Sequence, residues 1–216
     1  MIVHSMSLQE IRLELSDDLN TLGGKVNCIL KEFKRMVIKA SYFPYFKTYE
    51  VVSNEKRNKF LITLSVKKKS QRKDPDIAFW GVYTRPEGMY AVSLSIIDEK
   101  ARVFPPHFFQ RYRDRIIRNS KLSSMELIKH FVTSNWAMSY AIPTQEMYEV
   151  YESIEGCSHD LQLNILGACA DGYCFAEKQD EIYLMKTIIS HDMLFEDQKK
   201  IFSALRNLLF DAIKVK

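Results

Sequence analysis

Glycine, proline and cysteine are scarce in this chain, which has 7, 6 and 4 of them among its 216 residues. The low glycine and proline content excludes a collagen-like protein. Together with 46% hydrophobic and 12% aromatic residues, it also excludes a disordered or linker-rich protein. Four unevenly spaced cysteines are too few for a disulfide framework in a chain of this length. We therefore expect a globular protein whose cysteines are reduced thiols.

Long apolar runs are also missing from the sequence. No stretch approaches the ~18 consecutive apolar residues that a membrane-spanning helix needs. Residues 1–10 have neither a basic segment followed by an apolar run nor a small-residue cleavage site. We therefore expect a soluble cytoplasmic protein with no membrane partner. The formal net charge of +4 allows an anionic partner without requiring one.

The common nucleotide-binding and hydrolase signatures do not occur in the sequence. It contains no G-x-x-x-x-G-K-S/T or G-x-G-x-x-G loop, no G-x-S-x-G elbow and no H-E-x-x-H pair. Nucleotide-driven motors, dinucleotide-dependent enzymes, common serine hydrolases and zinc proteases therefore lose their usual sequence support. We expect no cofactor.

Apolar residues recur every three or four positions over residues 8–36, which is the helical period. Ser7 can cap the start of this segment. The pair Gly23-Gly24 costs about 1 kcal/mol of helix stability per glycine, so we expect two helices or one kinked helix. Further helices are expected over residues 105–118, over 125–140 behind a cap at Ser123 or Ser124, over 143–156, and as one last helix from about 190 to the C-terminus.

Strand-like runs rich in Val, Ile, Thr, Tyr and Phe form two groups. About four strands are expected within residues 47–98 and about three within residues 161–190. The connections inside each group are too short for parallel crossovers, which indicates antiparallel pairing. Asp171-Gly172 favours a two-residue hairpin turn, which would put Cys169 directly opposite Cys174. The expected strands are 49–53, 60–66, 77–84, 90–97, 161–170, 173–177 and 181–190.

These patterns predict an α+β fold, in which N-terminal, central and C-terminal helices pack on the apolar faces of antiparallel sheet elements. Neither an internal repeat nor a low-complexity segment is visible. We therefore expect residues 1–216 to form a single domain. If the chain holds two subdomains, they would meet near residues 100–105.

The segment after Pro105-Pro106 combines histidine and arginine at helical spacing. At 100° per residue, His107, Arg111 and Arg115 fall within one arc of the expected helix, while apolar residues lie opposite. Unpaired N–H groups and the helix dipole favour anions at the first turn. Two nearby guanidinium groups disfavour protonation of His107 and keep it available as a base. A phosphodiester suits such a site, and the alternative is the solvated face of an amphipathic helix.

The same residues carry a resemblance to a known group of enzymes. His107 followed by Arg111-Tyr112 and Arg115, and then by an antiparallel meander whose last strand carries Lys186-Thr187, resembles the barnase/RelE-like superfamily of metal-independent endoribonucleases, including its phage-associated branches. The resemblance covers about residues 105–190. A long helical stretch between the helix and the meander departs from the pattern.

The resemblance implies cleavage of RNA through attack by the 2′-hydroxyl group on the adjacent phosphate. It assigns His107 as base or proton donor, Arg111 and Arg115 as stabilisers of the phosphate, and Lys186 and Thr187 as secondary contacts. A ribonuclease that is not otherwise regulated in cytoplasm would also imply an inhibitory protein partner.

Residues 67–73 hold five cations in seven positions between two expected strands. Such a run can bind nucleic-acid phosphates, or it can keep an exposed hairpin loop soluble. A non-enzymatic interaction or nucleic-acid-binding protein of α+β class is therefore the alternative to an endoribonuclease. The cations are Lys67, Lys68, Lys69, Arg72 and Lys73.

A zinc site has little support in the sequence. Cys157, His159, Cys169 and Cys174 offer four ligands, but C-x-H followed by C-x4-C is not a spacing that structural zinc sites typically use. We expect no metal, and we interpret Cys169 and Cys174 as adjacent buried thiols.

Overall fold

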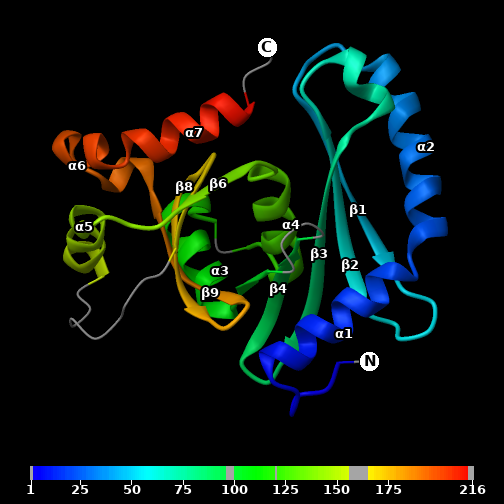
Figure 1. Cartoon of the computed structure of the whole chain (residues 1–216), viewed down its shortest axis with the longest axis horizontal. Coiled ribbons are helices and arrows are strands. Elements are labelled where there is room, and N and C mark those ends of the chain that lie inside the picture. Colours follow the sequence, from blue (N-terminus) through cyan, green and yellow to red (C-terminus); the bar gives the residue numbers. More distant parts are fainter. Residues whose placement is uncertain (1, 96–99, 120, 156–164, 214–216) are drawn as a thin grey trace.

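The computed structural model describes residues 2–95, 100–119, 121–155 and 165–213 (Figure 1). Within these ranges nine strands form one sheet in the order β1-β2-β3-β4-β5-β9-β8-β7-β6. Every neighbouring pair in the described sheet is antiparallel except β5 and β9, which run parallel. The strands are β1 (Tyr45–Val52), β2 (Lys59–Val66), β3 (Asp76–Arg85), β4 (Gly88–Leu94), β5 (Ala101–Phe104), β6 (Met138–Ala141), β7 (Ile165–Cys169), β8 (Gly172–Gln179) and β9 (Ile182–Ser190).

The α+β class is confirmed, but the prediction of separate antiparallel groups of about four and three strands is wrong. Strand β5 joins them, because Ala101–Phe104 pairs with β4 on one side and with β9 on the other. It is only four residues long and is followed directly by Pro105, so its sequence looks like a loop. The segment near residues 100–105, where two subdomains would meet, therefore contains a strand in the middle of the sheet.

The helix expected over residues 125–140 is shorter than predicted, because it ends at Ser134 and Met138–Ala141 forms the edge strand β6. Asn135 ends the helix. Its side-chain amide donates to the Phe131 carbonyl oxygen at 3.0 Å and to an Asp171 carboxylate oxygen at 2.8 Å. Helical periodicity alone could not show this, because Asp171 lies 36 residues further along the chain.

Local capping signals are confirmed at two helices. Ser7 and Ser123 each form a capping box with the glutamate three residues later. The N-terminal helical segment breaks into two helices near Gly23, as expected, whereas the single C-terminal helix is divided into three pieces. The helices are α1 (Leu8–Asn20), α2 (Gly23–Lys39), η1 (Lys69–Lys73), α3 (Pro106–Tyr112), the π-helical η2 (Arg113–Ile117), α4 (Ser124–Ser134), α5 (Gln145–Glu155), η3 (His191–Met193), α6 (Glu196–Ile201) and α7 (Ser203–Ile213).

Helices α3 and α4 pack on one face of the sheet, across the junction of its two halves. Phe108 of α3 and Phe131 of α4 pack edge to face, with ring centroids 5.3 Å apart. They share one apolar cluster with Phe104 of β5 and Met185 of β9. Burial of these side chains fixes α3 against β9, the strand that carries the candidate residues of the second half.

Helices α1, α2, α5, α6 and α7 cover the opposite face. Because successive side chains of a strand point to opposite faces, Leu61 joins the α3 and α4 cluster while its neighbour Phe60 packs with Leu15 of α1. In the second half of the sheet, Cys174 faces α3 and α4 while Tyr173 packs under α5, α6 and α7. The fold therefore has three layers. None of the helices in the described ranges combines the length and apolar composition needed to span a bilayer.

The hairpin between β7 and β8 differs in register from the prediction. Cys169 pairs with Gly172, and Cys174 pairs with Gly167, so the turn is Ala170-Asp171 and the two cysteines are not directly opposite. Gly172 adopts φ +156° and lies close to β9: a Cβ there would be 2.0 Å from the Ile189 carbonyl oxygen. This close approach requires glycine after the turn rather than within it.

We expect Gly172→Ala to lower the free energy of unfolding by about 2–4 kcal/mol, because the new Cβ meets backbone atoms of β9 at an unfavourable φ. Gly24→Ala is the matched control. Nothing lies within 4 Å of a Cβ at Gly24, which is in the first turn of α2, so this change should stabilise the protein by about 0.5 kcal/mol. Urea unfolding measures both values. Equal effects of the two changes would contradict the β8–β9 register.

Candidate active site

Helix α3 presents polar residues because its other side is anchored in the core. Pro105 precedes the helix and Pro106 occupies its first position, which suits proline because the missing N–H has no helical partner there. Phe108, Phe109 and Tyr112 are buried. His107 and Arg111 are consequently exposed, as the helical spacing predicts.

The packing of α3 on β9 brings together all five residues that the sequence assigned to the catalytic site. Lys186 and Arg111 are near enough to His107 to affect its ionisation. Arg115, on η2, donates from Nη1 to Thr187 Oγ1 at 2.9 Å and to the Ile188 carbonyl oxygen at 3.0 Å. These residues are more than seventy positions apart in the sequence, so the arrangement depends on the tertiary fold.

A sixth residue, Glu155 at the end of α5, was missed by the sequence analysis. Its side chain is only 5% exposed and forms an ion pair with Arg115. Its second carboxylate oxygen is 3.5 Å from Nη2 of Arg111, and its first accepts a hydrogen bond from Thr187 Oγ1 at 2.9 Å. A glutamate at the end of an amphipathic helix looks like a solvated residue, and no local pattern links it to Arg111 or Arg115.

The two arginines consequently have different surroundings. The Arg115 side chain is 13% exposed and its Nη1 is shared among Glu155, Thr187 and a backbone carbonyl. The Arg111 side chain is 49% exposed and touches Glu155 only at 3.5 Å. Arg111 can therefore contact a bound anion, while Arg115 holds α5 and β9 together beneath it.

The electrostatics favour a neutral imidazole at His107. Although the residue is exposed overall, partial burial against its neighbours lowers its pKa from the ordinary value of 6.5, and the positive charges of Lys186 and Arg111 lower it further. A backbone hydrogen bond with Lys186 opposes this shift without reversing it. Lys186 itself pairs with Glu177 at 2.7 Å. A neutral imidazole beside two cations can accept a proton close to a bound anion.

The basic segment of residues 67–73 lies far from this site. Lys69–Lys73 forms η1 before β3, whereas the turn at the other end of β3 approaches α3: a Cβ on Gly88 would be 2.9 Å from Pro106. Because β3 has ten residues, its two ends are separated by about 33 Å. Lys67, Lys68, Lys69, Arg72 and Lys73 therefore form a separate surface that one short ligand cannot share with His107.

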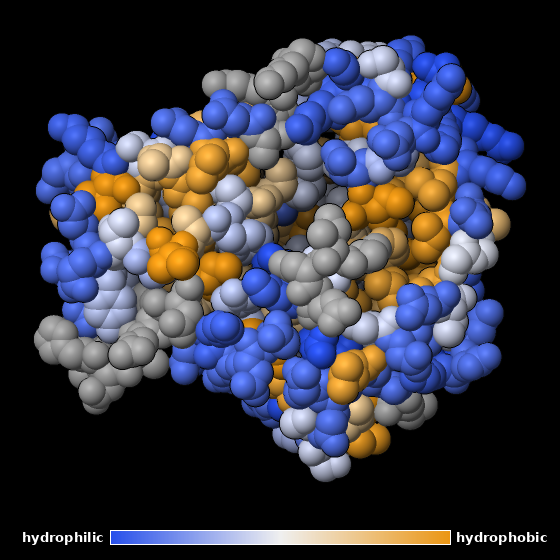
Figure 2. Space-filling model, in the orientation of Figure 1, coloured by the Kyte–Doolittle hydropathy of each residue, from blue (hydrophilic) through white to orange (hydrophobic). Residues whose placement is uncertain are grey.

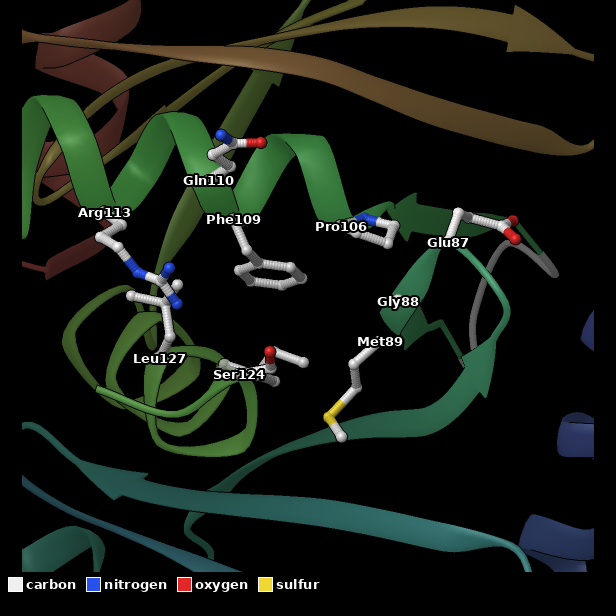
Figure 3. A pocket seen from close by; sticks show the side chains of 10 residues that line it. Glu87, Gly88, Met89, Pro106, Phe109, Gln110, Arg113, Ser124 and Leu127 are labelled. Atoms are coloured by element: carbon white, nitrogen blue, oxygen red, sulfur yellow. The ribbon is translucent and has the colours of Figure 1, made fainter. Parts of the chain in front are cut away.

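A pocket of about 190 Å³ lies on the adjacent side of α3 (Figure 3). We call it the α3 pocket. It opens between α3, the start of α4 and the β3–β4 turn, and Figure 3 shows the Phe109 ring, the Arg113 side chain and Ser124 around the same space. No sequence pattern indicates this pocket, because its walls come from three separate segments. Its border includes Glu87, Met89, Phe109, Gln110, Arg113 and Ser124.

A partly buried hydrogen-bond network fixes the far end of α3. Tyr112 donates from its hydroxyl group to an Asp171 carboxylate oxygen at 2.6 Å, and the same hydroxyl lies 2.9 Å from His130 Nδ1. Burial and the Asp171 charge raise the pKa of Tyr112, so it remains a protonated donor. Asp171 also accepts from Asn135. The network ties α3 and α4 to the β7–β8 turn and thereby sets the position of α3.

The described residues contain no group of three or more His, Cys, Asp or Glu side chains that could hold a metal ion. Cys169 and Cys174 are buried free thiols, and burial, together with a hydrogen bond with Cys169, raises the pKa of Cys174. The pair is thus adjacent without being directly opposite. Cys157 and His159 lie outside the described residues.

Comparisons of the chain with known protein families, with curated proteins and with solved structures found no match. The function must therefore be argued from the site itself.

Proposed function

We propose that the chain is a metal-independent endoribonuclease whose active site lies where α3 packs on β9. The observation that carries the proposal is the juxtaposition of His107 and Arg111 with Lys186, residues from two distant segments, in a setting that lowers the His107 pKa. Attack by a hydroxyl group on a phosphodiester needs a base that takes the proton and cations that stabilise the negative charge on the phosphate. His107 and its two cationic neighbours have these properties.

In the proposed reaction, His107 removes the proton from the 2′-hydroxyl group. The 2′-oxygen bonds to the adjacent phosphorus, and the bond from phosphorus to the 5′-oxygen breaks. The 5′-oxygen leaves with a proton from solvent, and a 2′,3′-cyclic phosphate remains. Arg111 and Lys186 stabilise the negative charge that develops on the phosphate. Arg115 and Thr187 act through their contacts with Glu155, which hold the site together.

Incubation of the purified protein with end-labelled RNA in excess chelator tests this proposal. We expect cleavage at pH values where His107 is neutral. Intact RNA at every pH from 5 to 8.5 would overturn the assignment. A nuclease of this kind would require an inhibitory partner in the cell that produces it, and co-expression with that partner would then be needed for good yield.

The pH dependence of cleavage should identify the base. Only neutral His107 can accept the proton, so the rate should rise with pH through an apparent pKa below 6.5 and then level off. Lys186→Met removes a repelling charge and leaves Glu177 nearby, so it should move this acidic limb to higher pH. Initial rates over a pH series measure both. An apparent pKa of the cleavage rate at or above 6.5 in the wild type, or a shift of that pKa to lower pH in Lys186→Met, would contradict the role of His107.

The alternative is a non-enzymatic interaction or nucleic-acid-binding protein. The exposed cations of residues 68–69 and 73 favour phosphate binding away from the α3 site. Large apolar residues such as Tyr42, Ile142 and Phe195 are also exposed, and Figure 2 shows hydrophobic areas over both halves of one face. On this alternative, RNA would bind but remain intact, and replacing Lys68 and Lys69 by alanine would reduce binding whatever the RNA sequence.

A further inference from the structure

The size of the α3 pocket limits what it can hold. Its volume of about 190 Å³ is slightly larger than the ~150 Å³ cavity that accommodates one benzene ring. It is smaller than the roughly 300–1,000 Å³ of sites for drug-sized ligands. One six-membered ring therefore fits inside.

The lining of the pocket combines a flat apolar wall with hydrogen-bonding groups. Phe109 and Met89 supply apolar surface, as Figure 3 shows. The Nε of Arg113 is buried and has no hydrogen-bond partner among the described residues, while its Nη2 donates to the Leu122 carbonyl oxygen at 3.1 Å. The guanidinium of Arg113 carries several N–H donors and its side chain lines the pocket, so a ligand that offers an acceptor there can form a hydrogen bond with it.

The rim of the pocket adds both kinds of polar group. Gln110 carries an amide with donors and an acceptor, and Ser124 carries a hydroxyl group. Glu87 offers a carboxylate that already accepts a hydrogen bond from Tyr90 at 2.6 Å. A ring with carbonyl oxygens and N–H groups at its edge, such as a pyrimidine base, matches this mixture better than a purely apolar ring does.

The pocket also adjoins the proposed phosphate site. His107 and Gln110 are three positions apart on α3, which places their Cβ atoms about 5–6 Å from each other. Arg111 directly follows Gln110. A ligand that reaches from the pocket to His107 and Arg111 therefore needs a ring and an anionic group joined by a short linker, as in a nucleotide.

We propose that the α3 pocket binds the pyrimidine base of the RNA nucleotide whose 3′-phosphate lies at His107 and Arg111. This inference rests on the proposed function, because it takes the phosphate site from it. It narrows the substrate class to single-stranded RNA with a pyrimidine on the 5′ side of the cut, since a base inside a duplex cannot enter a pocket.

Calorimetric titration with inorganic phosphate, uridine 3′-monophosphate and adenosine 3′-monophosphate tests the proposal. We expect uridine 3′-monophosphate to bind about tenfold more tightly than phosphate, and adenosine 3′-monophosphate to gain much less. Ser124→Leu, which narrows the pocket, should remove the gain while phosphate binding persists. Gln110 is exposed and alanine is a good helix former, so Gln110→Ala should leave α3 folded. It should reduce the affinity that uridine 3′-monophosphate gains over phosphate. Ser203→Leu, at the start of the distant α7, should change nothing.

The other possible results of these experiments distinguish failure of the pocket proposal from failure of the nuclease proposal. If uridine 3′-monophosphate binds no more tightly than phosphate, if its advantage survives in Ser124→Leu, or if the adenosine compound binds equally well, the pocket is not a pyrimidine site. If the uridine compound binds in a Ser124-dependent way but RNA stays intact, the pocket stands and the nuclease proposal fails. If RNA is cut without preference for pyrimidines, the nuclease stands and the pocket proposal fails.

Discussion

Replacement of His107 by alanine should lower the rate of RNA cleavage by about 10² to 10⁴, the range that one positioned acid-base group contributes. The fold should survive, because His107 is exposed on α3 and the packing of that helix depends on Phe108, Phe109 and Tyr112. Initial cleavage rates of labelled RNA measure the first effect, and the midpoint of thermal unfolding measures the second.

His130→Ala is the control for this experiment. His130 is also exposed on a helix, and it contacts Tyr112 and Ser134 rather than Arg111 or Lys186. Without His130, Tyr112 keeps its hydrogen bond to Asp171, which holds α3 in place, so we expect the cleavage rate of this variant to match that of the wild type. An unchanged rate in His107→Ala, or equal losses in the two variants, would show that the imidazole of His107 is not the base.

Replacement of Glu155 by alanine should lower the free energy of unfolding by about 3–5 kcal/mol, because it leaves the guanidinium of Arg115 buried without its counter-charge. The Arg115 side chain is 13% exposed and the Glu155 side chain 5%. The same change removes an acceptor from the buried hydroxyl group of Thr187. Urea unfolding followed by far-ultraviolet circular dichroism measures the loss.

Glu177→Ala provides the matched control, because it removes a glutamate paired with a cation at the same site. Lys186 and Glu177 are 24% and 31% exposed, so their ion pair should contribute only about 0–1 kcal/mol. Glu155→Gln, which keeps an oxygen acceptor for Thr187, should lie between the two alanine variants. If Glu155→Ala costs no more than Glu177→Ala, the buried cluster does not hold α5 against β9 and η2.

The parts of the fold that depend on local chemistry could be predicted from the sequence. The capping boxes at Ser7 and Ser123 and the break near Gly23 each involve residues only a few positions apart. The joining of the two strand groups into one sheet could not be predicted, because it depends on the pairing of β5 with β9, which are about eighty residues apart in the sequence. Such pairing depends on which exposed strand edges meet after the helices pack, and a four-residue strand carries no period to reveal it.

In the candidate site, too, the features that depend on one helix could be predicted and those that depend on tertiary packing could not. Helical spacing was sufficient to place His107 and Arg111 on one exposed face, because that arc is a property of α3 alone. Glu155 was missed because its partners come from η2 and β9, and its burial is created only by tertiary packing. The β7–β8 turn was predicted one residue too late, since the close approach of Gly172 to Ile189 involves a third strand.

The most direct test of the central claim compares an oligoribonucleotide with its 2′-O-methyl counterpart in excess chelator. If the α3 site acts as proposed, the wild-type protein cuts the RNA, leaves 2′,3′-cyclic phosphate ends, and does not cut the methylated strand, because no 2′-hydroxyl group is present to attack. Cleavage of both strands, cleavage only after a metal ion is added, or no cleavage of either would contradict the assignment of His107 and Arg111 as the core of a metal-independent ribonuclease.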